Sequence, residues 1–233
     1  MAAAGGLRPS VSCDTIGYMK CEHGHEAPPG AHHAHGGFDD PAAFASRLDS
    51  PERDAWQKPD EVIASFRLPR DATVAEIGAG TGYFAVRLAR RLSEGTVIAL
   101  DAEPKMVAYL RQRAAGLGLA NLDARLVRQS DAIPLAEAVD LLLCVDAYHH
   151  IPDRVETFAR YARHLKRGGR LVVIDRAPNA PDGPPAHFRL SAATVEQELA
   201  QSGFALLGSM DFLLPYQFYL AFTSADSDAE SSS

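Results

Sequence analysis

Cysteine, basic charge and long apolar runs are scarce in this sequence, and each scarcity excludes a class of protein. Three cysteines in 233 residues are too few for a disulfide framework. No apolar run approaches the roughly 18 residues that a membrane-spanning helix needs. The alanine- and glycine-rich start lacks the apolar segment of a signal peptide. We therefore expect a cytoplasmic protein with no membrane partner.

Basic residues are outnumbered by acidic ones. The formal net charge is -7 and the isoelectric point is near 5.7. The sequence has no basic stripe to bind phosphates, so we expect no nucleic-acid partner. Its length suits one α/β domain with an extension.

The two ends of the chain differ in composition from the middle. Residues 1–40 are rich in Gly, Pro, Ala and His and predict a disordered arm, and residues 224–233 predict a disordered tail. The arm contains His23, His25, His32, His33, His35, Cys13 and Cys21. Such a tract can bind a divalent metal weakly, but its spacing matches no zinc finger, and a flexible tail without metal is the alternative. We assign no specific metal site.

A helical cap is predicted over residues 41–70, before the first strand. Two short helices are expected at 41–48 and 51–66, with Pro59 as a break or a first-turn residue. Trp56 has two interpretations, which both stay open. It either belongs to a cover over a ligand cleft or packs its helix on the core.

A glycine-rich turn follows the first predicted strand, at residues 74–77. The turn contains Gly78, Gly80 and Gly82, and a helix is expected at 83–92. Glycines let the backbone approach a ligand closely, and the helix start points its free N–H groups at that ligand. This arrangement predicts a nucleotide-type cofactor site.

Strands and helices then alternate along residues 71–223, which predicts a parallel α/β sheet. The further strands are expected at 96–100, 124–128, 140–145, 169–174, 204–210 and 217–222. The last two are too close together for a crossover, so they must run antiparallel. The predicted fold is Rossmann-like and doubly wound, a mostly parallel seven-stranded sheet with an antiparallel last strand and helices on both faces.

The spacing of the glycines distinguishes between cofactors. A dinucleotide site needs Gly-x-Gly-x-x-Gly, whereas here Glu76 is followed by Gly78-Ala79-Gly80-Thr81-Gly82. With Asp101 after the second strand and Asp131 after the third, this pattern resembles the class I S-adenosylmethionine-dependent methyltransferases over roughly residues 50–222. The resemblance implies S-adenosyl-L-methionine as cofactor and methyl transfer to a small molecule by in-line displacement.

The resemblance also implies roles for individual cofactor-binding residues. Glu76 would lie near the methionine amino group, the backbone of the three glycines near the methionine and ribose, and Asp101 near the ribose hydroxyls. The remaining implied positions are Met106 on the adenine face, Asp131 and the Ala132 N–H at the adenine edge, and the Asp146 backbone at the transfer site. For Met106, an ordinary position in a helix core is the alternative.

The residues that would bind or deprotonate the methyl acceptor are harder to identify from the sequence. His149 or Tyr148 could act as a general base, although a histidine in such a loop also serves as a hydrogen-bonded packing residue. Arg176, His187 and Arg189 are the polar candidates of the loop at 176–190. The two arginines could hold an anionic substrate or be solvated surface charges.

Other functions fit the sequence less well. Asp146-Ala147-Tyr148-His149 departs from the motif of amino-group DNA methyltransferases. Too few cysteines are suitably placed for a metalloid methyltransferase, and the glycine spacing disfavours an NAD-dependent oxidoreductase. The alternative from another class is a metal-binding or sensor protein that uses the histidine-rich arm on an inactive methyltransferase scaffold.

Overall fold

The computed structural model describes residue 45 and residues 48–128 and 131–225, all within one compact unit, Ala34–Ser233. The predicted arm lies outside the described residues, as does most of the predicted tail. Of the helix predicted at 41–48, Ala45 and Leu48 are described, and both are helical.

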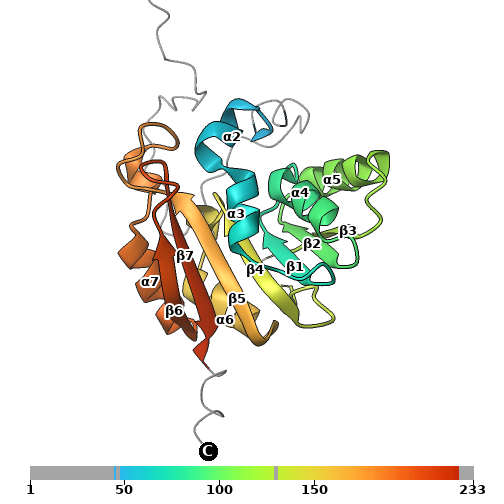
Figure 1. The fold of residues 1–233 in the computed structure, drawn as a ribbon. Helices are drawn as coiled ribbons and strands as arrows, with labels where there is room; N and C mark the ends of the chain where they lie inside the picture. The colour runs from blue at the N-terminus through green and yellow to red at the C-terminus, as the bar shows by residue number, and fades with distance from the viewer. Residues whose placement is uncertain (1–44, 46–47, 129–130, 226–233) are drawn as a thin grey trace, which may run out of the picture. The chain divides into compact units, whose positions relative to one another are not determined.

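A seven-stranded sheet forms the centre of this unit (Figure 1), in the order β3-β2-β1-β4-β5-β7-β6. β7 runs antiparallel to both of its neighbours, and the other strands are parallel to one another. This confirms the predicted doubly wound sheet with a reversed last strand. The strands are β1 Thr73–Ile77, β2 Thr96–Asp101, β3 Leu122–Leu126, β4 Val139–Val145, β5 Leu165–Arg176, β6 Phe204–Met210 and β7 Gln217–Ser224.

Helices cover both faces of the sheet, as predicted (Figure 1). Two hydrophobic clusters separate along the sheet because successive strand residues point to opposite faces. One cluster joins the sheet to α3, α4 and α5, and the other joins it to α6 and α7. The helices are α2 Glu52–Gln57, α3 Pro59–Ser65, α4 Tyr83–Arg91, α5 Pro104–Gly116, α6 Arg154–Ala162 and α7 Ala192–Gln201.

Local signals in the sequence set several helix boundaries. Lys58 adopts a left-handed conformation and separates α2 from α3, which begins at Pro59. The helix predicted over 51–66 is therefore two helices, because proline can start a helix but not continue one. The Ser191 hydroxyl accepts the Thr194 N–H at the start of α7, and Gly203 follows the end of α7 with a φ of 84°, as expected for an N-cap and a terminating glycine.

Two predicted strands need correction. The third strand is Leu122–Leu126 and not 124–128, because the charged Asp123 and Arg125 alternate with inward-facing residues and hide the apolar pattern. The fifth begins at Leu165 and not at 169. Its pairing with β4 shifts register between Val139 and Leu141, so the polar stretch before residue 169 belongs to an irregular start of β5.

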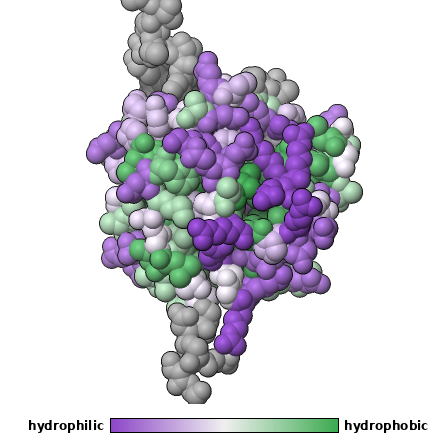
Figure 2. Space-filling model, in the orientation of Figure 1, coloured by the Kyte–Doolittle hydropathy of each residue, from purple (hydrophilic) through white to green (hydrophobic). Residues whose placement is uncertain are grey.

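The surface of this unit is mostly polar, with apolar exceptions. Figure 2 shows hydrophobic residues gathered where Figure 1 places β6 and β7. The exposed apolar residues there include Leu206, Leu207 and Met210 of the edge strand β6. Within the described part of the chain, no helix is long and apolar enough to cross a membrane.

Candidate functional site

The turn between β1 and α4 is built on three glycines in the left-handed region. Gly78, Gly80 and Gly82 have φ values of 73°, 54° and 86°, which cost other residues free energy. A Cβ on Gly78 would lie 2.4 Å from Ala147 Cβ, and one on Gly82 would lie 2.3 Å from Leu110 Cδ1. At Gly80 the nearest atom would be Leu48 Cδ1 at 3.9 Å. The turn is therefore packed at both ends and open at Gly80.

Asp101 ends β2 directly beside this opening. Its carboxylate accepts the Gly80 N–H at 2.7 Å and the Glu103 N–H at 2.9 Å. Burial raises the pKa of Asp101, although these backbone hydrogen bonds oppose the rise. A carboxylate oxygen accepts more than one hydrogen bond, so Asp101 retains acceptor capacity for ligand hydroxyls.

Glu76 is the buried acid near the end of β1, just before the turn, with 4% of its surface exposed. Its Oε2 atom has no hydrogen-bond partner among the described residues. Burial raises the pKa of Glu76 to about 8, although the Arg53 charge and a hydrogen bond from the Ala85 backbone lower it. An orphaned buried carboxylate oxygen is unfavourable by itself and suits a cationic ligand group.

The residues expected around adenine lie at the start of α5 and in the loop after β3. Met106 is 1% exposed, which fits its core interpretation and leaves the adenine contact a prediction. Asp131 and Ala132 are exposed. Arg128 Nη1 lies 3.8 Å from the Asp131 carboxylate, and Arg160 donates a hydrogen bond to the Asp131 carbonyl.

Asp146, at the carboxyl end of β4, gathers polar side chains from distant elements. Its Oδ1 atom accepts a hydrogen bond from Gln217 Nε2 at 2.7 Å, and its Oδ2 atom accepts one from Gln57 Nε2 at 3.3 Å. Arg53 Nη2 and Arg176 Nε lie 3.5 Å and 3.8 Å from the carboxylate. The sequence assigned Asp146 a role through its backbone, whereas the structure places its side chain at the centre of a polar cluster.

His149 is paired with Asp175, the acid near the end of β5. Its Nδ1 atom lies 2.8 Å and 3.0 Å from the two carboxylate oxygens. Burial alone would lower the pKa of His149, but the hydrogen bond and charge of Asp175 outweigh it and raise that pKa. Because Nδ1–H donates to Asp175, Nε2 is the atom left to accept a proton.

Tyr148 lies in a different environment from His149. Its side chain is fully buried, packs on Phe158 with ring centroids 4.9 Å apart, and donates a hydrogen bond to Glu198 Oε2 at 2.9 Å. Burial and the contact with Glu198 raise the pKa of Tyr148. This geometry favours a packing role for Tyr148 and leaves His149 as the candidate base.

The two candidate arginines have different surroundings: Arg176 is the last residue of β5 and not part of the loop expected at 176–190, whereas Arg189 lies in that loop. Arg189 donates to the backbone carbonyls of that loop at Pro178, Ala180, Asp182 and Pro184, so it stabilises the loop. Arg176 stacks on Trp56 at 3.9 Å from the ring centroid. Trp56 is half-buried beside Tyr216, so it lies at the site, as the cover interpretation requires.

Sequence reasoning missed four members of the site: Arg53, Gln57, Asp175 and Gln217. Asp175 had a usable signal, because an acid at the carboxyl end of a parallel strand lies where open α/β sheets bind ligands. Nothing local distinguishes the two glutamines, which are both completely buried and become neighbours only through the fold.

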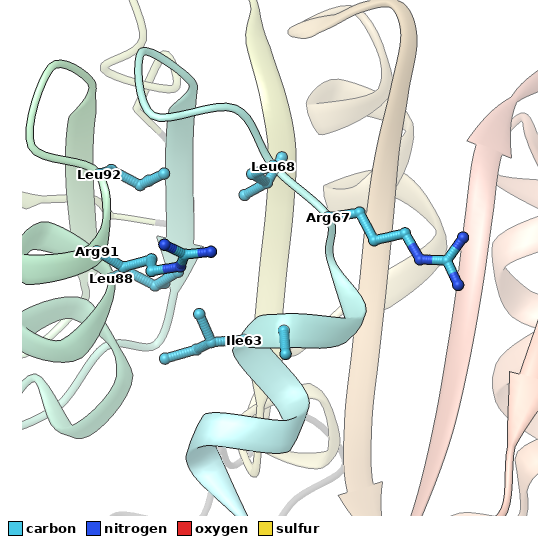
Figure 3. Close-up of a pocket in the computed structure, with 7 residues that line it drawn as sticks. Ile63, Arg67, Leu68, Leu88, Arg91 and Leu92 are labelled. Atoms are coloured by element: carbon cyan, nitrogen blue, oxygen red, sulfur yellow. The ribbon is translucent and has the colours of Figure 1, made fainter.

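Two cavities lie away from this site. One, of about 30 Å³, lies between α3 and α4 and is lined by Ile63, Leu68 and Leu88 among others (Figure 3), so it has room for about one water. The other, of about 400 Å³, is a depression open to solvent along α6 beside Glu198. Neither is lined by the glycine turn or Asp101.

The residues of the turn fit S-adenosylmethionine. The opening at Gly80 admits a ligand close to the backbone, the orphaned Glu76 oxygen suits an ammonium group, and Asp101 suits hydroxyls. Among the described residues, no three His, Cys, Asp or Glu side chains are grouped to hold a metal ion. The histidine-rich arm lies outside the described residues.

Comparison with known proteins leads to one family. A model described as a methyltransferase domain matches residues 74–169. The trans-aconitate 2-methyltransferase of Deinococcus radiodurans is 33% identical over 138 residues, which are 59% of this chain and 50% of that protein. The malonyl-[acyl-carrier protein] O-methyltransferase of Methylococcus capsulatus is 32% identical over 152 residues, 58% of this chain and 53% of that protein. The chain spans about half the length of these curated relatives.

Solved structures share the fold. An S-adenosylmethionine-dependent methyltransferase from Aquifex aeolicus superimposes with a TM-score of 0.73 at 25% identity, covering 78% of this chain and 97% of that one. The [4+2]-cyclase SpnF superimposes with a TM-score of 0.61 at 18% identity, covering 73% of this chain and 80% of that one; this likeness is one of fold alone.

These matches agree with the glycine turn, with the acids Glu76 in β1 and Asp101 at the end of β2, and with the order of the sheet. S-adenosylmethionine is the cofactor of the enzymes in this family, and the turn of this chain has the groups to bind it. Residues 74–169 thus match a methyltransferase domain, and the chain is similar to S-adenosylmethionine-dependent methyltransferases in sequence and in fold.

Proposed function

We propose that the protein is an S-adenosylmethionine-dependent methyltransferase that acts on a small-molecule acceptor. The observation that carries the proposal is the buried, unpartnered oxygen of Glu76 beside the open glycine turn. The trans-aconitate 2-methyltransferase and demethylmenaquinone methyltransferase of Deinococcus radiodurans, two of its relatives, bear the names of small acceptors. With so few cysteines, a cytoplasmic location is part of the proposal.

When bound, S-adenosylmethionine supplies an activated methyl group, so the protein's main task is alignment. Glu76, the three glycines and Asp101 are the proposed cofactor-binding residues, with Met106, Asp131 and Ala132 around the adenine and Asp146 at the transfer site. His149 is the proposed base. Its Nδ1–H is held by Asp175, so Nε2 would take a proton from an acceptor that must lose one.

Calorimetric titration with S-adenosylmethionine and S-adenosylhomocysteine tests the cofactor site. We expect micromolar binding that Asp101→Ala abolishes. The matched control is Asp123→Asn on the neighbouring strand β3, whose half-exposed carboxylate pairs with Arg125, and which should bind as the wild type does. Absence of binding to the wild-type protein would overturn the proposal.

A methyl-transfer screen then tests the reaction. The same fold occurs in a [4+2]-cyclase, so fold does not determine reaction. We expect stoichiometric S-adenosylhomocysteine and a methylated small molecule. Cofactor binding without turnover of any small acceptor, but with turnover of a protein, would contradict the proposed acceptor class.

A further inference from the structure

The polar cluster around Asp146 contains two guanidinium groups that its carboxylate does not satisfy. Arg53 Nη2 lies 3.5 Å and Arg176 Nε lies 3.8 Å from the carboxylate oxygens. Charge-assisted hydrogen bonds between such groups are about 2.7–2.9 Å long. Both arginines are therefore near Asp146 without a close hydrogen bond to it.

Some of the other donors of the two arginines are already engaged. Arg53 donates through Nε to Gln57 Oε1 and through Nη1 to the Leu48 carbonyl at 2.7 Å. Arg176 donates through Nη1 to Asp182 at 2.5 Å, a residue whose side chain is 48% exposed. The edges that face Asp146, Arg53 Nη2 and Arg176 Nε, remain for a further acceptor.

Two glutamines occupy the carboxylate oxygens of Asp146 and keep it from pairing more closely with the arginines. Gln217 and Gln57 donate to its two oxygens, at 2.7 Å and 3.3 Å, and neither glutamine has any exposed surface. The Asp146 side chain is 22% exposed, whereas those of Arg53 and Arg176 are 13% and 12% exposed. Asp146 has the most exposed side chain of the three, so a ligand from solvent would reach the cluster past Asp146.

Aromatic rings fix the planes of both guanidinium groups. Arg176 lies 3.9 Å from the centroid of Trp56, and Arg53 lies 4.1 Å from that of Tyr83. Stacking of this kind leaves the in-plane N–H groups free to bind an oxyanion. Burial lowers the pKa of Arg53, and the nearby charge of Arg176 adds to this, whereas the charge of Asp146 opposes it.

We propose that the methyl acceptor carries a carboxylate group, which binds between Arg53 and Arg176 at the carboxyl end of β4. This inference rests on the proposed function and names its substrate class. A carboxylate fits better than a phosphate, because Asp146 and Asp182 already pair with the two cations and would repel a dianion more strongly than a monoanion. Figure 1 shows α2, which carries Arg53, at the same end of the sheet as the loop that follows β5.

The test is a binding and turnover screen on the intact protein. Protein saturated with S-adenosylhomocysteine is titrated with a panel of aliphatic and aromatic carboxylic acids, each beside its primary amide and its phosphate analogue. The same panel is assayed for turnover with S-adenosylmethionine. We expect saturable binding of one or more acids, weaker binding of their amides and phosphates, and methylation only of compounds with a carboxylate.

Variants separate this site from the general charge of the protein. Arg176→Gln should weaken binding of the acid by about tenfold or more, the usual effect of losing a hydrogen bond to a charged group, and leave S-adenosylhomocysteine binding within about twofold. Lys166→Gln, which removes one positive charge at the opposite end of β5, where Lys166 pairs with Asp140, should change neither.

The outcomes are distinguishable from failure of the proposed function. If S-adenosylhomocysteine itself does not bind, the methyltransferase assignment fails. If it binds, three results overturn the carboxylate proposal alone. These are no binding by any acid, equal binding of acids and amides, or an unchanged affinity in Arg176→Gln; preference for the phosphates would assign the cluster to a phosphorylated acceptor instead.

Discussion

At the scale of single residues, the site contains buried charged groups whose partners do not fully offset the free-energy cost of removing the charge from water. Glu76 has an oxygen without a partner among the described residues, and Arg53 and Arg176 lie 3.5 Å and 3.8 Å from the carboxylate of Asp146. Such groups reduce the stability of the free protein and become favourable only when a ligand completes them. Substitution should therefore separate stability from binding.

Glu76→Gln should stabilise the free protein and abolish cofactor binding. Burial raises the pKa of Glu76 from 4.5 to about 8, so between these pH values the folded protein binds one more proton than the unfolded chain. Stability therefore falls as pH rises through this window, by about 1.4 kcal/mol for each unit of pKa shift at most. Denaturant unfolding from about pH 5 to about pH 8 should show this fall in the wild type and not in the variant.

The control for this measurement is Glu94→Gln, an exposed carboxylate in the turn before β2. It should keep the pH dependence of the wild type. A wild-type stability that does not change over the window would show that Glu76 titrates normally.

Cofactor binding should release a proton near neutral pH. The carboxyl of Glu76 is mostly protonated there because its pKa is about 8, and an ammonium group beside it favours the ionised form. Calorimetry in two buffers of different ionisation enthalpy gives the number of protons released. We expect a value approaching one in the wild type and near zero in any residual binding by Glu76→Gln; proton uptake would contradict the assigned contact.

His149 should set the lower limb of the pH–rate profile. Asp175 raises its pKa above the usual value, so kcat/KM should rise as pH increases through that pKa, where Nε2 becomes free. Asp175→Asn should move this limb to lower pH, and His149→Gln should lower kcat by about 10²–10⁴-fold. His164→Gln, at a histidine in the turn between α6 and β5, is the control, and an unchanged profile in Asp175→Asn would remove the base assignment.

At the scale of elements, the turn between β1 and α4 combines two requirements on glycine. Gly78 and Gly82 have no room for a Cβ, whereas Gly80 has room but an unfavourable φ. Only at Gly80 is space left where a ligand can approach the backbone. Within five residues, the turn therefore has two glycines that serve packing, Gly78 and Gly82, and one that is available for ligand binding, Gly80.

Gly80→Ala should affect binding more than stability. Its left-handed φ of 54° costs an alanine about 1–2 kcal/mol, and the added methyl group enters the space expected for the cofactor. Gly118→Ala, at φ 66° with nothing within 4 Å, should lose similar stability and bind S-adenosylhomocysteine normally. Thermal unfolding and calorimetry of both variants make the comparison; equal affinities would place the ligand elsewhere.

At the scale of the whole molecule, the sheet leaves β6 as an edge with apolar side chains. Leu206, Leu207 and Met210 are 40%, 56% and 41% exposed, and β6 contains no charged residue or proline. Unprotected edge strands of this kind favour intermolecular pairing.

Leu207→Lys should therefore lower self-association without loss of stability, because its side chain contributes little to the core. Light scattering as a function of protein concentration measures the effect. Leu117→Lys removes a comparably exposed leucine away from the edge and should change scattering less. Equal scattering by both variants would show that the edge is not the contact.

The local features of the fold were predictable from the sequence because they depend on neighbouring residues. The turn of Gly78, Gly80 and Gly82, the start of α3 at Pro59 and the cap at Ser191 are each encoded within a few positions. Alternation of strands and helices then restricts the sheet to one family of topologies. Strand ends were less predictable where charged residues hid the apolar pattern, as in β3.

The acceptor side was decided by tertiary structure alone. Asp146 is hydrogen-bonded to Gln57 and Gln217, which lie 89 and 71 positions away in the sequence. No local pattern encodes such contacts. Tyr148 and His149 are adjacent in sequence, yet one is bound to Glu198 and the other to Asp175. The sequence by itself determined the cofactor turn, because backbone conformation is a local property. The partners of each buried charge depended on which strand ends and helices the fold brings together.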